Sequence, residues 1–182
     1  MIIFTVFTVV AGVTWLAGGF GRAQLPRLAA GESIRGNRFR FQPLRAWASD
    51  EHPRGYGNEP AKSYLVVAFA VTNFGRETAT PSDVHEVLRV RTAPGGKLRG
   101  SDETFLLGAA AGSQLHPGMP VRLAAVWELG SGSQNLAEVT VVIADHRLVT
   151  NNFAIKEAHW RAGDRLATAT LPVVGRSERE NG

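Results

Sequence analysis

The side chains best suited to metal or acid–base chemistry are five histidines, and their spacing matches no catalytic pattern. No two of them are four residues apart, as two metal ligands on one helix face would be, and no His-Glu-x-x-His motif occurs. The sequence therefore predicts no metal site, although a surface copper or zinc cluster formed by converging loops stays open as an alternative. The histidines are His52, His85, His116, His146 and His159.

Acidic and nucleophilic residue types also fail to form a recognisable site. Acidic pairs at residues 50–51 and 102–103 lie in expected loops, but neither belongs to a D-x-D-x-D-G calcium loop. Asp-His at 145–146 and Ser-Asp-Glu-His at 49–52 contain the residue types of a hydrolase triad without a G-x-S-x-G elbow. Gly-Ser-Gly-Ser at 130–133 lacks the Lys-Ser/Thr of a phosphate loop. We therefore predict no catalytic residue and no cofactor, and keep a hydrolase triad assembled from distant loops as a third hypothesis.

Composition removes further classes of chemistry. The absence of cysteine excludes a disulfide framework, a thiol nucleophile, a cysteine-based metal site and a lipobox-type lipid anchor. The net charge is +4, but the basic residues form no block with interleaved aromatics, and acidic residues occur along the whole chain. The sequence therefore predicts no nucleic-acid partner.

The first 21 residues carry no charged side chain. At roughly 1.5 Å per residue, an uncharged run of this length can cross the hydrocarbon core of a bilayer as a helix. We therefore expect a single transmembrane anchor over residues 1–21, followed by a linker over 22–37, with the lipid bilayer as a partner. Trp15, Arg22 and Arg27 are the residues that we expect at the membrane interface.

Two alternatives to this topology stay open. A secretory signal has a basic first region, which is missing here, but Ala17 and Gly19 leave a weak cleavage site. Arginines just after the apolar run favour a cytoplasmic domain by the positive-inside rule. The basic collar beside the expected bilayer is interpreted either as a solvated surface or as a contact for anionic head groups. It consists of Arg22, Arg27, Arg35, Arg38, Arg40 and Arg45.

Residues 38–174 have the pattern of an all-β domain followed by a polar tail over 175–182. Ser63–Asn73 is the most apolar stretch and predicts a central strand buried on both faces. Seven or so short strands with Gly/Pro turns and no amphipathic helix predict a β-sandwich. Residues 153–160 are ambiguous between helix and strand. The other strands are predicted over residues 38–48, 84–92, 104–107, 121–129, 137–144 and 166–174, with Phe39 and Phe41 on one face of the first and Trp127 in the core.

Three features in order resemble the immunoglobulin-like exported domains of actinobacteria and Firmicutes, a group largely of unknown function. They are the strand over residues 64–75 ending in Asn-x-Gly, Gly-Gly-Lys at 95–97, and the turn at 115–118 before a strand with Val-Trp-Glu-Leu at 126–129. The resemblance covers about residues 38–150 and implies an immunoglobulin-like antiparallel β-sandwich outside the cytoplasm. It carries over no catalytic residue, and both the retained anchor and the extension over 151–182 depart from the family pattern.

Together these features indicate a non-enzymatic, single-pass membrane protein that presents its sandwich on the extracytoplasmic side. Its expected role is that of a binding or accessory subunit of an integral membrane protein complex. The alternative is a secreted soluble module that binds a small ligand or inhibits a protein. Because sandwich domains bind partners through loops and edges, the expected partner-binding residues are Tyr56, Arg54 and His116. Tyr56 lies between glycines in a polar loop, where it is either an interface anchor or folded back onto the sandwich.

Overall fold

The computed structural model describes residues 24–55, 62–93, 95–108, 113–129, 136–150 and 158–174. The expected anchor over 1–21, the expected tail over 175–182 and Tyr56 lie outside these residues. Within the described ranges, no helix has the length and apolar character needed to cross a membrane.

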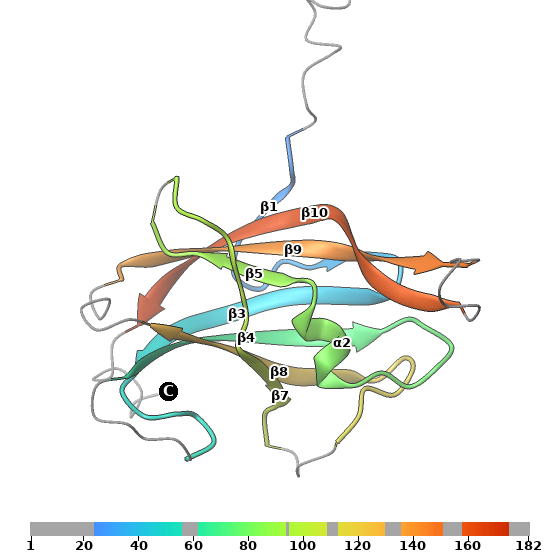
Figure 1. Ribbon diagram of the computed structural model, residues 1–182, viewed down its shortest axis with the longest axis horizontal. Coiled ribbons are helices and arrows are strands. Elements are labelled where there is room, and N and C mark those ends of the chain that lie inside the picture. The colour runs from blue at the N-terminus through green and yellow to red at the C-terminus, as the bar shows by residue number, and fades with distance from the viewer. Residues whose placement is uncertain are drawn as a thin grey trace, which may run out of the picture.

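The described residues form a β-sandwich, as the sequence predicts, in which two layers of strands enclose the core (Figure 1). One layer has the strand order β6-β5-β9-β10 and the other has the order β3-β4-β8-β7. The end of β10 pairs in parallel with β3 and so joins the two layers along one edge. The elements are β1 (Arg27–Leu28), β2 (Ile34–Arg35), β3 (Phe39–Ser49), β4 (Ser63–Asn73), α2 (Pro81–His85), β5 (Leu88–Arg91), β6 (Arg99–Gly100), β7 (Glu103–Leu106), β8 (Pro120–Leu129), β9 (Glu138–Val149) and β10 (His159–Val174).

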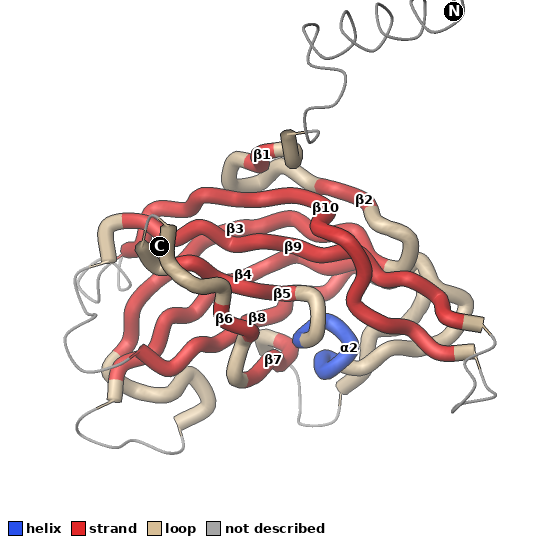
Figure 2. Tube along the Cα trace, turned by 45° about the horizontal axis from the view of Figure 1, so that its top comes forward, coloured by secondary structure: helices blue, strands red, loops and turns tan. Residues whose placement is uncertain are grey.

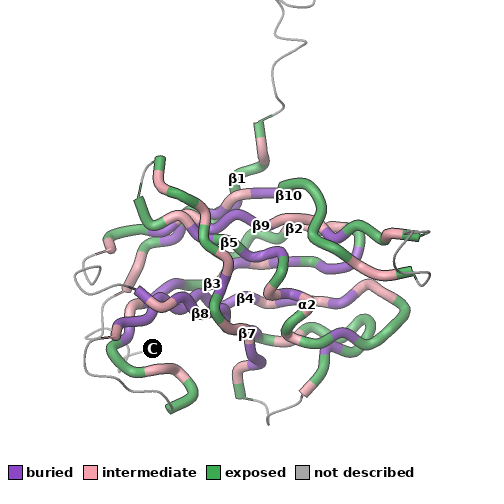
Figure 3. The backbone as a smooth tube through the Cα atoms, in the orientation of Figure 1, coloured by how far each residue is buried: buried purple, intermediate pink, exposed green. Residues whose placement is uncertain are grey.

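Alternating apolar residues build the main core between the layers. Phe39 and Phe41 of β3 both point inward and are 1% exposed, as the alternation predicts. Phe69 of β4 and Trp127 of β8 are fully buried in the same cluster. Figure 3 shows this burial along the middle of the strands. Since each large side chain removed from water contributes about 1.5–3 kcal/mol, this cluster supplies most of the driving force for folding.

The prediction that β4 is buried on both faces is confirmed. Its inward residues belong to the main core, whereas Tyr64, Val66 and Ala68 belong to a second cluster on the outer face of the sheet. Residues of the other strands of this layer complete that cluster: Trp47 of β3, Ala124 and Val126 of β8, and Phe105 of β7. A strand with apolar partners on both sides has no polar alternation, which explains its continuous hydrophobic sequence.

Two short strands precede β3 in the stretch expected to be a linker (Figure 2). β1 pairs with β10 and β2 pairs with β3, and Leu28 of β1 is buried in the core. Two-residue strands leave no period in the sequence, so their pairing could not be anticipated. The folded unit therefore includes residues before position 38.

The strand predicted over residues 84–92 is wrong in its first half. The chain forms the helix α2 at this point, and β5 begins only at Leu88. Thr80 and Asp83 form a capping box, with Pro81 in the first helical turn. This Thr-Pro-x-Asp pattern is a signal for the start of a helix. The sequence prediction followed the apolar residues after position 83 instead and therefore expected a strand.

β9 and β10 extend well beyond the strands predicted over 137–144 and 166–174. They pair from the register Glu138–Pro172 to the register Val149–His159, and the added residues are mainly polar or exposed. The ambiguity over 153–160 resolves to a strand from His159 onwards, and residues 151–157 lie outside the described ranges. Backbone pairing rather than burial extends the β9–β10 hairpin. The extension places the end of β9 and the start of β10 at one end of the sandwich.

Candidate functional site

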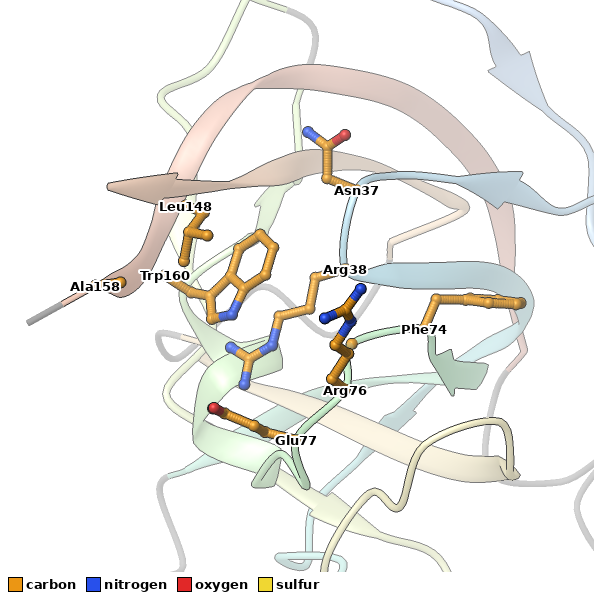
Figure 4. Close-up of a pocket in the computed structure, with 9 residues that line it drawn as sticks. Asn37, Arg38, Phe74, Arg76, Glu77, Leu148, Ala158 and Trp160 are labelled. Carbon is orange, nitrogen blue, oxygen red and sulfur yellow. The ribbon is translucent and has the colours of Figure 1, made fainter. Parts of the chain in front are cut away.

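Four strand ends meet at one end of the sandwich because of the antiparallel registers. Phe39 at the start of β3 pairs with Asn73 at the end of β4, and Val149 at the end of β9 pairs with His159 at the start of β10. Between them lies an open cleft of about 430 Å³, which we call the tryptophan cleft (Figure 4). The larger side chains that line it are Asn37, Arg38, Phe74, Arg76, Glu77, Leu148 and Trp160.

Arg38 is the most buried cation of this cleft. Its side chain runs beside Trp160 (Figure 4), with the guanidinium carbon 5.4 Å from the indole centroid. Its Nη1 donates to Asp83 Oδ1 at 2.8 Å, and only 6% of the Arg38 side chain is exposed. The sequence placed Arg38 in a basic collar that was solvated or in contact with head groups. The structure corrects this for Arg38, because a buried guanidinium requires a charged partner.

Asp83 is held in place by the start of α2. Its Oδ2 accepts hydrogen bonds from the backbone N–H and the hydroxyl of Thr80, at 2.7 and 2.8 Å. Burial alone would raise the pKa of Asp83, but the hydrogen bonds from Thr80 and Arg38 and the charge of Arg38 together lower it. The carboxylate therefore stays ionised and neutralises the guanidinium at the floor of the cleft.

His146 of β9 lies behind this pair and is 2% exposed. Its Nε2 lies 2.9 Å from the carbonyl oxygen of Asp83, which fixes the proton on Nε2 as the donor. Its Nδ1 is buried with no hydrogen-bond partner in the part of the chain that is described. Burial lowers the pKa of His146, as does the charge of Arg38, whereas the Asp83 carbonyl and the charges of Asp83 and Glu86 act in the opposite direction.

Protonation of His146 should therefore destabilise the fold. The pKa of His146 is lower in the folded state than in the unfolded state. Below about pH 6.5, therefore, His146 is protonated to a greater extent in the unfolded state. We expect the free energy of unfolding to fall as the pH drops from 6.5 towards the folded-state pKa. Urea unfolding at several pH values would measure this slope. His146→Gln should flatten it, and an unchanged slope in that variant would assign the pH dependence to other groups.

The neighbouring Asp145 does not act as a triad partner of His146. Its Oδ1 accepts the backbone N–H groups of Asn37 and His146, both at 2.8 Å, and its Oδ2 accepts the Asn37 side-chain amide. Gly36 makes this approach possible, because a Cβ at that position would overlap the Asp145 carboxylate. The Asp-His pair at 145–146 thus ties the start of β3 to β9, which positions Arg38.

A second cleft of about 350 Å³ shares Phe74 with the first, and we call it the arginine cleft. The guanidinium carbon of Arg35 lies 4.2 Å from the Phe74 ring centroid, and that of Arg40 lies 4.9 Å from it. Cation–π contact of this kind orients both guanidiniums while leaving their N–H edges available. The polar and aromatic side chains that line this cleft are Ser33, Arg40, Gln42, Thr72 and Phe74.

Of the predicted partner-binding residues, the two that the structure describes, Arg54 and His116, are not brought together by the fold. Arg54 pairs with Glu103 at 3.0 Å and lies 4.7 Å from the Phe105 ring centroid, beside the first half of β4. His116 is exposed in the turn that meets the end of β4, with Nδ1 3.4 Å from the Thr78 hydroxyl. Arg27 is exposed on β1, and Tyr56, Trp15 and Arg22 lie outside the described residues. Their roles at a partner or a membrane stay predictions.

Sequence reasoning missed Phe74, Leu148 and Trp160 as members of one site. Leu148 is 47% exposed, which is high for a large apolar side chain. Phe74 directly follows the end of the predicted central strand, so an aromatic in a strand-ending Asn-Phe-Gly turn was an available signal. No sequence signal marked Leu148 of β9 or Trp160 of β10 as members of the site, because their place in it depends on the long-range pairing of these two strands.

The described residues include no group of three or more His, Asp or Glu side chains placed to hold a metal ion. His52 contacts Glu103 at 3.2 Å, and His85 Nδ1 lies 3.0 Å from the Ser101 hydroxyl. These histidines thus lie in separate polar contacts on different elements.

The two strand layers define the chain as a β-sandwich protein, and a solved structure shares that fold. An uncharacterised β-sandwich protein from Clostridium difficile matches with a TM-score of 0.54 and 11% identity, covering 83% of this chain and 95% of its own. A secreted protein from Mycobacterium tuberculosis matches with a TM-score of 0.44 and 14% identity, covering 83% and 99%. No protein-family model and no curated protein sequence matches the chain. The first likeness shows the fold alone.

Proposed function

We propose that the protein is a non-enzymatic binding module, anchored by its first 21 residues, that serves as an accessory subunit of an integral membrane protein complex. Its sandwich, of the immunoglobulin-like type, lies on the extracytoplasmic side. The anchor is supported by the uncharged run over residues 1–21. The external side is supported by the resemblance to exported domains and opposed by the arginine count after the apolar run.

The observation that carries the binding role is the tryptophan cleft. It combines an exposed aliphatic side chain, Leu148, with the half-buried indole of Trp160 and the guanidiniums of Arg38 and Arg76. Tryptophan and arginine are enriched among residues that dominate protein interfaces, and an aliphatic neighbour adds area that binding removes from water. Because Leu148 and Trp160 lie on paired strands and Arg38 is held by Asp83, these groups lose less entropy on binding than groups on a long loop would.

The anchored state favours a partner in the same membrane. Tethering to the bilayer raises the effective concentration of the module near such a partner, so a modest interface is sufficient. The alternative of a secreted module would follow if the first 21 residues were removed from the mature chain.

Leu148→Glu is expected to abolish recovery of the partner complex without a change in folding. The side chain is already half-exposed, so a charge there costs little stability, usually within about 0.5 kcal/mol. It would, however, replace an apolar contact with a charged group that binding must remove from water, which weakens the interface. The measurement is affinity purification of the full chain from detergent-solubilised membranes, with the melting temperature of each variant.

Thr170→Glu is the matched control, because Thr170 is exposed on β10 near the opposite end of the sandwich. This control should recover the partner as well as the unmodified chain does. Equal recovery by Leu148→Glu would remove the tryptophan cleft from the interface.

A further inference from the structure

The arginine cleft has a chemistry that the proposed protein interface does not use. Arg35 of β2 and Arg40 of β3 face each other in register and both stack on Phe74. Within the described ranges, neither guanidinium has a carboxylate at ion-pair distance. Two cations held against one ring without anions leave a local positive charge that a ligand can neutralise.

Arg40 lines the cleft, whereas Arg35 lies beside it, paired with Arg40 and stacked on the same Phe74 ring. The lining adds neutral donors to these cations. Ser33 and Thr72 carry hydroxyls, the Gln42 amide donates to the Gly31 carbonyl, and no acidic residue is among the described lining residues. A site with several donors and no carboxylate favours an anion with many acceptor oxygens.

These properties select phosphate over a carboxylate. A guanidinium fork binds either anion in a bidentate way, but a carboxylate has two oxygens and is satisfied by one fork. A phosphate group presents more oxygens and up to two negative charges, so it can accept from Arg40, from the hydroxyls and from a second arginine together. The volume of about 350 Å³ is sufficient for such a group with part of the molecule that bears it.

We propose that the arginine cleft binds a phosphate-bearing ligand, held by Arg40 and Arg35, with Phe74 as the positioning residue that orients both guanidiniums. The phosphate belongs either to a soluble phosphorylated compound or to a lipid head group. The inference rests on the proposed function only in treating this end of the sandwich as its binding end. It does not require a protein partner.

The test measures thermal stabilisation of the full chain in dodecyl maltoside micelles, which contain no phosphate. One arm titrates sodium pyrophosphate against sodium chloride at matched ionic strength, and the other adds phosphatidylglycerol to the micelles. A ligand that binds only the folded state raises the melting temperature in a concentration-dependent way, which gives an apparent Kd. Pyrophosphate stabilisation indicates a soluble ligand, stabilisation by phosphatidylglycerol alone indicates a lipid head group, and either result supports the proposal.

Arg40→Gln and Arg35→Gln should each weaken this binding by about tenfold or more, as expected for loss of a charge-assisted hydrogen bond. Phe74→Leu keeps the apolar bulk but removes the ring, so it should weaken binding by a few-fold and leave the salt dependence unchanged. Arg45→Gln is the matched control, because Arg45 is also exposed and stacks on an aromatic, 5.1 Å from the Trp47 ring centroid, away from the cleft. Arg45→Gln should bind as the unmodified chain does.

The proposal is overturned if neither arm stabilises the protein beyond chloride, or if Arg45→Gln weakens binding as much as Arg40→Gln does. Leu148→Glu separates this inference from the proposed function, since it should keep the phosphate response. Normal partner recovery by Leu148→Glu with an intact phosphate response would contradict the protein interface and leave the phosphate site standing.

Discussion

Phe69→Ala should lower the free energy of unfolding by about 3–5 kcal/mol, the largest effect expected from a single core substitution in this protein. Phe69 is fully buried in the middle of β4 and is paired with Leu123 of β8 and Pro43 of β3. Its removal leaves a cavity between two layers whose strands are fixed on both sides, so the site cannot collapse to fill it. A loss of this size is a large part of the about 5–15 kcal/mol that stabilises a typical domain.

Urea unfolding followed by tryptophan fluorescence would measure the effect. Arg122→Ala is a suitable control, because Arg122 is exposed on β8 opposite Ala70 and should change stability by less than about 0.5 kcal/mol. A nearly neutral Phe69→Ala would show that the main core lies elsewhere.

Breaking the Arg38–Asp83 pair should have the second largest effect, and the cost should depend on which partner is removed. Asp83→Asn leaves the guanidinium of Arg38 charged and only 6% exposed, without its counter-ion. We expect a loss of about 2–3 kcal/mol, somewhat below the about 3–5 kcal/mol of a fully buried pair, because the Asp83 side chain is 30% exposed. Arg38→Met should cost less, since water can solvate the remaining carboxylate and Thr80 still binds it.

A double-mutant cycle at pH 7 would measure this asymmetry. The double variant should be less destabilised than the sum of the two single variants, because removing the second partner relieves the charge left by the first. Equal costs for the two single variants together with strict additivity would show that the pair contributes no coupling energy. Because the pKa of Asp83 is lowered, acid removes its charge only below about pH 3.8. This pH range is separate from the range in which His146 becomes protonated.

The sequence was sufficient for the layer architecture but not for the two clefts. The alternation in β3 and the apolar run of β4 could be interpreted directly, because apolar residue types mark the faces of a strand that are buried. The burial of Arg38 could not be foreseen, because it requires Asp83, a residue 45 positions away in a helix that was not predicted. Leu148 and Trp160 become neighbours of Arg38 only through the extended β9–β10 hairpin, whose outer half carries polar residues without a period.

The arginines of the expected basic collar also have environments that the sequence alone does not predict. The sequence treats them as one group, whereas the fold gives them different environments: Arg38 is buried against Asp83, Arg35 and Arg40 stack on Phe74, and Arg45 stacks on Trp47. Their roles therefore follow from the aromatic or acidic side chain that each one meets, and not from the charge of the segment.

Site-specific photo-crosslinking from position 148 would show whether an anchored module binds a membrane protein through the tryptophan cleft. A photoreactive amino acid replaces Leu148 in the full chain, with the same substitution at Thr170 as the control, and cross-linking is carried out in carbonate-washed membranes. We expect the chain to stay in the membrane pellet. Position 148, but not position 170, should yield a discrete cross-linked product that contains an integral membrane protein. Release of the chain by carbonate, or equal cross-linking from both positions, would contradict an anchored module that binds its partner through the tryptophan cleft.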